Sequence, residues 1–343
     1  MSRVLYATEP GCAVVRTVDP DPLAEDELRI ALDLTAEKHG TTLPTFAGHR
    51  EAAGGYDSEK ELFVSAEEPA DPFPFRLGNM GVGHVTEIGS DVEGFGVGDR
   101  VFGYGPHAER WTVTEDARLW AAPDGVSDEA LVCTDPITVA ILATRYGDVG
   151  LGDRVAVFGL GAIGLFAVQA SRLAGGMPVI AVDPIADRRD LAASFGAEHT
   201  IDPTTADAGR TIKELTDGAG VDAALEISGS HDALHHAIRG TAYGGAVVPV
   251  SYYHDDPGGL DLAKEWHFNR HRMVAGARVE SEPYRDHPRW DRARVYETAI
   301  ECLDQARLSA DGIVSTIRFE DAPAVYERLA VDATAELKVA IEH

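Results

Sequence analysis

The feature that most constrains this chain is the hexapeptide GLGAIG that begins at Gly159, because it directly follows the apolar run RVAVF and directly precedes an apolar helical segment. In a strand–turn–helix unit, Gly159 permits the tight turn, Gly161 lets a ligand approach the backbone, and Gly164 lets the helix pack closely on the strand. The N–H groups at the helix start attract phosphate. The pattern therefore predicts that a dinucleotide binds with its pyrophosphate over this turn. We predict that the dinucleotide also contacts Ala162 and Ile163.

A carboxylate follows at the spacing expected of an acid that binds ribose. Asp183 ends the next predicted strand, PVIAVD, 19 residues after Gly164, close to the spacing of about 20 in dinucleotide-binding units. A carboxylate there accepts hydrogen bonds from the ribose hydroxyls and repels a 2′-phosphate, so the sequence favours NAD over NADP. Arg188 follows Asp183 closely in the chain, and we predict that it also contacts the cofactor. Its charge offsets part of that repulsion, so NADP stays the alternative.

Strands and helices alternate over residues 151–283. The predicted strands are RVAVFGL, PVIAVD, HTID, VDAALEIS, AVVPVSYY and HRMVAGARV, with helices between most of them. This alternation predicts an α/β fold with a doubly wound parallel sheet, the Rossmann arrangement. Ligands of such sheets bind at the carboxyl ends of the strands. We therefore predict that Ser228 and Gly229, after the fourth strand, and Ser251, after the fifth, border the dinucleotide.

The segments that flank this unit have a different pattern. Residues 1–150 contain short β-rich pieces broken by Gly and Pro, which predicts a compact, barrel-like β domain. Residues 284–343 hold one helical run, ARVYETAIECLDQARL, and end in the strand LKVAIEH. The simplest layout is a β-rich domain over 1–150, a dinucleotide-binding domain over 151–283, and a return to the first domain over 284–343.

The charge balance of the chain disfavours a nucleic-acid partner. Asp and Glu total 57 against 30 Lys and Arg, a net charge of −27, which disfavours nucleic acid because phosphate binding needs a basic face. Dispersed carboxylates with few lysines suit a cytoplasm rich in salt, where screening weakens their repulsion. We interpret the composition as that of a halophile; an ordinary acidic enzyme that uses arginine in place of lysine is the alternative.

The apolar runs and the cysteines predict a cytoplasmic protein. No run approaches the roughly 18 apolar residues of a membrane helix, and MSRVLYATEPG lacks the apolar core of a secretory signal. Cys12, Cys133 and Cys302 lie far apart and form no CxxC pair, which fits a reducing compartment. We expect a small-molecule substrate and no membrane partner.

Four segments together carry a family likeness: GVGHVTEIGSDVEGFGVGDRVFGYG, CTDPITVAILA, GDRVAVFGLGAIGLFAVQASRLAG and DGAGVDAALEISGS. In this order they resemble the medium-chain dehydrogenase/reductase superfamily, which includes the zinc alcohol and polyol dehydrogenases. The resemblance implies a GroES-like catalytic domain beside the Rossmann domain, a homodimer or homotetramer, and hydride transfer between an alcohol carbon and nicotinamide. It also implies a catalytic zinc.

The zinc positions depart from the family pattern. His39 stands where the family has a cysteine, Asn79 and Met80 stand where it has a His-Glu pair, and Asp135 falls on the later ligand. Zinc prefers Cys, His and carboxylate, so Asn and Met are poor ligands for it. Only His39 and Asp135 are suited to hold a zinc if one is retained, one fewer than the usual three. The sequence therefore predicts a site without metal.

The same positions suggest how an alcohol is oxidised without that metal. Thr41 matches the family's proton-relay hydroxyl, and His39 has an intrinsic pKa suited to acid–base catalysis near neutrality. Asp135 is predicted to orient that imidazole or accept a substrate hydroxyl, and Asn79 to donate a hydrogen bond to the substrate oxygen. Each has a structural alternative: an interior histidine for His39, and a helix cap for Asp135. His107 is predicted either to reach the substrate or to lie in a turn.

We therefore predict an oxidoreductase that converts a secondary alcohol, polyol or sugar-like, to a ketone with NAD. One alternative is a zinc-free reductase of quinones or enones on the same scaffold. Another is a protein that binds a dinucleotide without catalysis.

Overall fold

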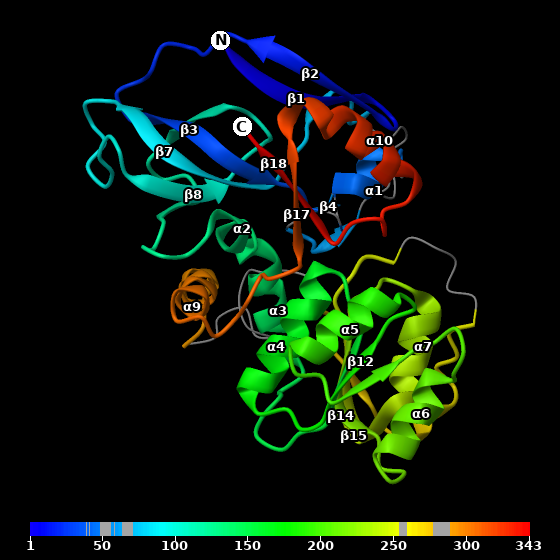
Figure 1. Ribbon diagram of the computed structural model, residues 1–343. Helices are drawn as coiled ribbons and strands as arrows, with labels where there is room; N and C mark the ends of the chain where they lie inside the picture. Colours follow the sequence, from blue (N-terminus) through cyan, green and yellow to red (C-terminus); the bar gives the residue numbers. More distant parts are fainter. Residues whose placement is uncertain are drawn as a thin grey trace. The chain divides into compact units, whose positions relative to one another are not determined.

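The computed structural model describes residues 1–38, 40, 42–48, 56–57, 59–63, 71–253, 259–276 and 289–343. They form two units (Figure 1): Met1–Val132 with Ile313–His343 make the first, and Cys133–Gly312 make the second.

The second unit is built on a six-stranded sheet in which every pairing is parallel, and this confirms the predicted doubly wound sheet (Figure 1). All four residues of its first strand along the chain and of the second are buried, as expected of parallel strands with both faces covered. In spatial order the strands are β13 (His199–Ile201), β12 (Val179–Val182), β11 (Val155–Phe158), β14 (Val221–Glu226), β15 (Thr241–Pro249) and β16 (Arg272–Met273).

Helices of the second unit supply the cover that a parallel sheet requires. One shared core joins apolar residues of β11, β12, β13, β14 and β15 to apolar residues of two of the helices. The helices are α3 (Thr134–Tyr146), α4 (Ala162–Ala174), α5 (Ala186–Ser194), α6 (Ala208–Leu215), α7 (His231–Gly240), α8 (Glu265–Phe268) and α9 (Arg292–Asp304).

The sixth strand is shorter than the predicted run HRMVAGARV. It covers Arg272–Met273, beyond which the N–H groups of Val274 and Gly276 still donate to carbonyls of β15, at 3.0 and 2.8 Å. Residues 277–279 of the run lie outside the described residues.

The first unit is β-rich, and its sheets join residues from both ends of the chain. β18 (Lys338–Glu342) pairs antiparallel with β3 (Glu27–Ala36), so the C-terminal segment pairs with a strand from near the N-terminus in one sheet. A three-stranded sheet has the order β2 (Cys12–Val18), β1 (Ser2–Glu9), β6 (Phe75–Arg76). The larger sheet has the order β10 (Leu119–Ala121), β8 (Arg100–Tyr104), β7 (Met80–Ile88), β3 (Glu27–Ala36), β18 (Lys338–Glu342) and β17 (Val314–Arg318), with β9 (Arg110–Thr114) also paired to β3.

Short elements complete the first unit. They are α1 (Thr42–Phe46), β4 (Tyr56–Asp57), β5 (Leu62–Phe63), α2 (Asp128–Leu131), the 3₁₀ turn η1 (Phe319–Asp321) and α10 (Ala322–Val331).

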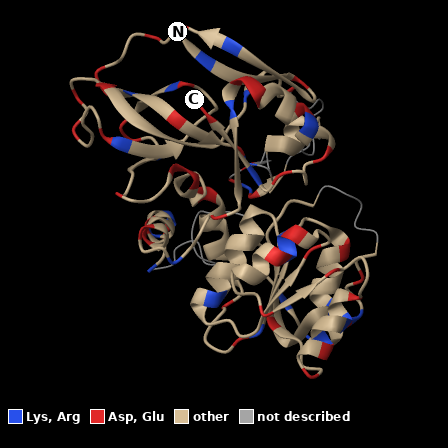
Figure 2. Ribbon diagram, viewed as in Figure 1, with Lys and Arg blue, Asp and Glu red and all other residues tan. Residues whose placement is uncertain are grey.

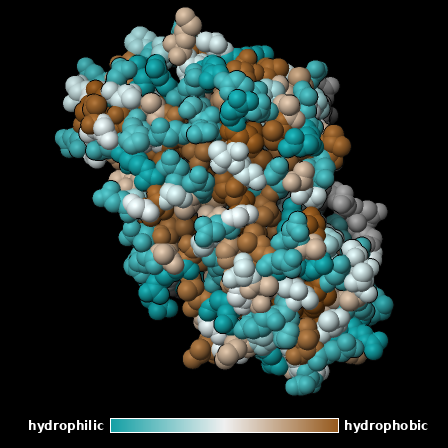
Figure 3. Space-filling model, viewed as in Figure 1, coloured by the Kyte–Doolittle hydropathy of each residue, from teal (hydrophilic) through white to brown (hydrophobic). Residues whose placement is uncertain are grey.

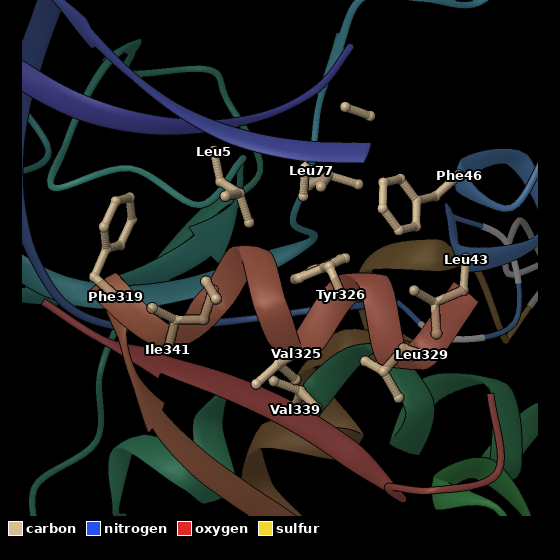
Figure 4. Packing of buried hydrophobic residues seen from close by; sticks show 13 residues of the cluster. Leu5, Leu43, Phe46, Leu77, Phe319, Val325, Tyr326, Leu329, Val339 and Ile341 are labelled. Atoms are coloured by element: carbon tan, nitrogen blue, oxygen red, sulfur yellow. The ribbon is translucent and has the colours of Figure 1, made fainter. Parts of the chain in front are cut away.

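One core of the first unit forms where α10 packs on the small sheet and on β18 (Figure 4). Tyr326 projects from α10 on the side of Leu77 and Phe46, and its ring meets the Phe46 ring edge-on at 5.6 Å. Tyr326, Phe46 and Leu77 are all 0% exposed. Burial of side chains of this size contributes about 1.5 to 3 kcal/mol each, so α10 is firmly held in place.

Acidic residues occur on strands, helices and loops of both units rather than in one run (Figure 2). Hydrophilic residues occupy much of the face drawn in Figure 3, with apolar patches between them. Within the described parts of the chain, no helix has the length and apolarity needed to span a bilayer.

Candidate functional site

The glycine turn connects β11 to α4 with the geometry that its residues predict. Gly159 has φ 85°, a left-handed conformation that favours glycine. A Cβ on Gly159 would lie 2.6 Å from the backbone nitrogen of Ser228, so the turn also passes closely over the end of β14. A Cβ on Gly164 would overlap the carbonyl of Gly159. The helix and the turn can approach this closely because Gly164 has no Cβ.

The start of α4 is open to a ligand. Gly161 is its N-cap residue and no side chain caps it. Among the described residues, no atom lies within 4 Å of where a Cβ on Gly161 would project. An uncapped helix start with open space beside it can accept an anion at its N–H groups, which are those of the first turn, beginning at Ala162 and Ile163.

Asp183 lies at the carboxyl end of β12 and is 4% exposed. One carboxylate oxygen accepts the N–H of Leu160 at 2.7 Å, and the other accepts the N–H of Ile185 at 2.8 Å. The side chain therefore ties the glycine turn to the end of β12. Each oxygen keeps a second lone pair, so the carboxylate can still accept ribose hydroxyls.

The end of β14 is organised by a buried glutamate that sequence reasoning missed. Glu226 is 0% exposed and accepts the N–H of Ser228 at 2.8 Å, the N–H of Gly229 at 3.3 Å, and the hydroxyls of Ser228 and Tyr253. Burial raises the pKa of Glu226, against the lowering effect of these hydrogen bonds. The available signal was a carboxylate inside the otherwise apolar strand VDAALEIS.

Ser251 has a structural partner at the same sheet edge. Its hydroxyl donates to the carbonyl of Ile227 at 2.6 Å. A Cβ on Gly229 would lie 2.7 Å from the carbonyl of Tyr252 and 3.2 Å from the Cβ of Ser251. The predicted cofactor residues after β14 and β15 are thus brought together in one tight contact.

A pocket of about 350 Å³ opens beside these strand ends. Its lining includes Gly159, Asp183, Ser228, Asp232 and His236. Burial is the main effect that lowers the pKa of His236, although the nearby Asp207 opposes it. The two carboxylates that line the pocket leave it better suited to a neutral ribose than to a phosphate.

The arginines of α5 are placed differently from each other. Arg189 donates to the carbonyl of Asp183 at 2.7 Å and forms an ion pair with Asp202 at 3.3 Å. Arg188, which was predicted to contact the cofactor, is half-buried in α5 and is not among the residues that line this pocket.

Two of the four predicted catalytic residues, His39 and Thr41, lie outside the described residues. Asn79 belongs to the first unit, directly before β7. Its backbone is fixed by two hydrogen bonds, from its N–H to Ala36 at 2.9 Å and from the N–H of Gly105 to its carbonyl at 3.0 Å. Its side-chain Nδ2 is buried without a hydrogen-bond partner in the described part of the chain. A buried, unused N–H₂ on a fixed backbone is suited to donate to a ligand oxygen.

Asp135 belongs to the second unit, in the first turn of α3, and is 6% exposed. Its carbonyl accepts the hydroxyl of Thr138 at 2.7 Å. The N-cap residue of α3 is Cys133, so the helix-cap alternative for Asp135 is wrong. A carboxylate in a first turn is stabilised by the helix dipole.

The described residues offer a poor set of zinc ligands. They contain no group of three or more His, Cys, Asp or Glu side chains able to hold a metal. Asn79 offers only a neutral amide and Met80 only a fully buried thioether, and both are poor zinc ligands. These two positions do not fit a catalytic zinc.

Comparison with known proteins agrees with this geometry. Residues 50–135 match the family model of the alcohol dehydrogenase GroES-like domain, and residues 162–289 match that of zinc-binding dehydrogenases. The D-guloside 3-dehydrogenase of Escherichia coli is 38% identical over 332 residues, which cover 94% of each chain. The (R,R)-butanediol dehydrogenase of Bacillus subtilis is 32% identical over 224 residues, 56% of this chain and 64% of that one.

Solved structures show the same fold. The crystal structure of 2R,3R-butanediol dehydrogenase from Bacillus subtilis has a TM-score of 0.79 at 22% identity and covers 100% of both chains. That of galactitol-1-phosphate dehydrogenase from Escherichia coli has a TM-score of 0.79 at 21% identity, over 99% of this chain and 100% of that one. The predicted combination of a GroES-like domain with a Rossmann sheet is therefore confirmed, and the chain belongs to the medium-chain dehydrogenase superfamily of nicotinamide-dependent oxidoreductases.

Proposed function

We propose that the protein oxidises a secondary alcohol of a polyol or sugar-like substrate to a ketone, with NAD as the hydride acceptor. One relative, which matches 94% of this chain, is named for dehydrogenation of a guloside at position 3, and another is named for a butanediol. The observation that carries the proposal is Asp183, whose carboxylate lines the pocket beside the glycine turn.

The preference for NAD rests on the charges around that pocket. Asp183 and Asp232 both line it, while Arg189 is held by Asp202 and by the backbone. A 2′-phosphate carries about −1.5 to −2 charges and would meet the carboxylate of Asp183 at short range. A structural neighbour from Sinorhizobium meliloti was crystallised with NADP, at 22% identity, so both cofactors belong in the test.

We propose further that the reaction needs no zinc. Bound nicotinamide supplies the hydride acceptor and a positive charge near the reacting carbon. In place of a metal, Asn79 donates its unused N–H₂ to the substrate oxygen and stabilises the alkoxide that develops there. His39 takes the hydroxyl proton, Thr41 relays it, and Asp135 orients the imidazole or binds a substrate hydroxyl.

The domain limits and the assembly are also proposals. We assign residues 1–150 and 284–343 to the catalytic domain and 151–283 to the dinucleotide-binding domain. By likeness to the family we expect a homodimer or homotetramer.

The test is NADH formation from a panel of polyols and glycosides, measured with the purified protein in high salt before and after dialysis against a chelator. We expect turnover with NAD, unchanged by the chelator, and no stoichiometric zinc by elemental analysis. Turnover that stops on dialysis and returns with zinc would refute the metal-free site. Consumption of NADH with quinones or enones, and none with ketones, would favour the reductase.

The same preparation tests the residue assigned to the substrate oxygen. Asn79→Ala removes the donor and should lower kcat by roughly 10²- to 10³-fold, as loss of one oxyanion donor does. Asn79→Gln keeps an amide N–H₂ and serves as the matched control. Equal activity of the alanine variant and the wild type would remove Asn79 from the mechanism.

A further inference from the structure

Two polar residues flank the glycine turn, one on each side. Strand β11, which leads into the turn, lies between β12 and β14, and the three strands run parallel, so their carboxyl ends meet at one edge of the sheet. Asp183 directly follows β12, and its carboxylate accepts the N–H of Leu160 in the turn at 2.7 Å. Ser228 comes two residues after β14, and its backbone nitrogen lies 2.6 Å from where a Cβ on Gly159 would project. Both residues line the pocket.

The hydroxyl proton of Ser228 is committed to a buried carboxylate. Ser228 donates its O–H to Oε1 of Glu226, which also accepts the N–H of Ser228 at 2.8 Å. The Ser228 oxygen itself accepts the N–H of Ser230 at 3.1 Å. A hydroxyl has one proton and two lone pairs, so one lone pair is left over. Because Ser228 is exposed, that lone pair can meet a ligand, and it can do so only as an acceptor.

Four donors converge on Glu226 and fix the direction of these bonds. Oε1 accepts the two from Ser228, and Oε2 accepts the N–H of Gly229 at 3.3 Å and the hydroxyl of Tyr253. An ionised carboxylate has about four acceptor sites and no proton to donate. Burial raises the pKa of Glu226, and all four hydrogen bonds oppose that rise. Burial and the Glu226 charge raise the pKa of Tyr253, so the tyrosine keeps its proton and stays a donor.

A purely structural role does not require a carboxylate at this place. The neighbouring residues of β14, Ala223 to Leu225, are buried and apolar, and a charged group among them costs free energy of desolvation. The N–H of Ser228 belongs to an exposed residue, and water can satisfy it. The carboxylate of Glu226 adds what water does not, which is a fixed acceptor that keeps the Ser228 proton away from the pocket.

Two acceptors beside the turn match a ribose whose hydroxyls are both free. A dinucleotide with its pyrophosphate over the glycine turn brings its adenosine ribose to the end of β12. The 2′- and 3′-hydroxyls of that ribose are donors on neighbouring carbon atoms. The Asp183 carboxylate can accept one of them, and the remaining lone pair of Ser228 can accept the other.

We propose that Ser228 is the second ribose acceptor of the dinucleotide site, beside Asp183, and that Glu226 is the positioning residue that holds it in this role. Glu226 acts through Ser228, because it binds the hydroxyl proton on the inner side and so presents a lone pair to the ribose. The proposal rests on the proposed function, in which NAD is the cofactor, and it gives each ribose hydroxyl of that cofactor an acceptor.

Three variants test the two parts of the proposal. Ser228→Ala removes the acceptor at an exposed position. Glu226→Met keeps a side chain of similar length but takes no proton from Ser228, whose hydroxyl is then free to donate. Glu226→Gln should behave as the wild type, because its amide oxygen can replace Oε1 and its N–H₂ can donate to the Tyr253 oxygen. The matched control is Glu198→Met, which removes a carboxylate that accepts the N–H of Val179 at 2.7 Å, at the opposite end of β12.

The probes are 5′-AMP, 2′-deoxy-5′-AMP and 3′-deoxy-5′-AMP. Their Kd values are measured by displacement of bound NADH, followed by its fluorescence, at one pH and one salt concentration. In the wild type both deoxy analogues should bind more weakly than 5′-AMP. The hydroxyl that meets Ser228 should account for roughly two- to tenfold in Kd, as one hydrogen bond to a neutral acceptor does.

The variants should change the Kd ratio of one deoxy analogue to 5′-AMP. In Ser228→Ala one of the two analogues should bind as well as 5′-AMP does, while the other keeps its wild-type ratio because Asp183 is unchanged. The ratio of the same analogue should fall in Glu226→Met and stay at the wild-type value in Glu226→Gln and Glu198→Met. A merely structural role of Glu226 would lower the fraction of protein that binds NADH and leave these ratios unchanged.

The outcomes separate this proposal from the proposed function. Wild-type ratios in Ser228→Ala, or in Glu226→Met, would overturn the proposal and leave both Asp183 and the alcohol oxidation standing. Glu226→Leu takes the place of the methionine variant if that protein does not fold. If the wild type binds neither NADH nor 5′-AMP, the proposed function fails and this proposal fails with it. The expected ratios in a protein that oxidises no alcohol would support the pair of acceptors and refute the oxidation alone.

Discussion

Replacement of Asp183 by alanine should weaken or reverse the proposed preference for NAD over NADP. The change removes two separate things. One is the support of the glycine turn, since the carboxylate accepts the N–H groups of Leu160 and Ile185 at 2.7 and 2.8 Å. The other is the negative charge at the pocket wall. Lost support weakens both cofactors alike, so the ratio of their affinities reports only what the carboxylate does at the ribose: it repels a 2′-phosphate and accepts hydrogen bonds from free hydroxyls.

The magnitude follows from Coulomb's law. Two unit charges 4 Å apart interact by about 1 kcal/mol at the permittivity of water and about 4 kcal/mol at an effective permittivity of 20. Removing the repulsion of a 2′-phosphate should therefore improve NADP relative to NAD by roughly five- to a thousandfold. Hydrogen bonds from ribose hydroxyls to a carboxylate contribute about 1.5 to 3 kcal/mol each, and their loss should weaken NAD in absolute terms.

The assay is calorimetric titration of each cofactor, NAD and NADP, into the wild type and the variant at equal salt. Asp187→Ala is the matched control, because it removes an exposed acid of the same helix region that does not line the pocket. That control should leave the ratio of the two affinities unchanged. Equal weakening of both cofactors by Asp183→Ala would refute the assignment of Asp183 to the ribose and would limit it to supporting the turn.

Two further predictions concern stability. Because the net charge is −27, the melting temperature should rise by several degrees between about 0.1 and 1 M KCl, as the screening length falls from about 10 to 3 Å. Sucrose serves as an uncharged control. A melting temperature that does not change with KCl would count against the halophilic interpretation. Burial lowers the pKa of His343 from 6.5 to about 4. As the pH falls, the imidazole is therefore protonated in the unfolded chain before it is protonated in the folded protein. The free energy of unfolding should fall between about pH 6.5 and pH 4, by up to about 3 kcal/mol from this residue. Denaturant titrations should show a shallower loss in His343→Gln than in the wild type or in His199→Gln, at an exposed position.

The cofactor turn was predictable because its signals are local. Each requirement of the turn fixes one residue type at a set spacing: glycine where φ is positive, glycine where the helix packs against the turn, and an acid at the end of the next strand. Gly159, Gly164 and Asp183 needed no knowledge of distant contacts. The parallel sheet followed for the same reason, since fully buried strands such as VAVF are apolar throughout.

The buried polar groups were not predictable because their partners are distant in the chain. Tyr326 meets His107 across 219 positions and Glu37 across 289. Nothing in the local pattern distinguishes a tyrosine of α10 that donates to a carboxylate from one that only packs. Glu226 was missed for a similar reason. A single acid in an apolar strand indicates a buried carboxylate, but the sequence does not show which groups donate hydrogen bonds to it.

The replacements at the metal positions bear on one chemical requirement. A zinc ion would lower the pKa of a bound hydroxyl and so ease its loss of a proton. Asn79 and Met80 are poor zinc ligands, and in the proposed mechanism without metal the proton leaves from a less acidic hydroxyl and needs a base, the role that we assign to His39. The unused amide N–H₂ of Asn79 then stabilises the alkoxide. In this proposal the two functions that one metal would combine are carried by separate residues.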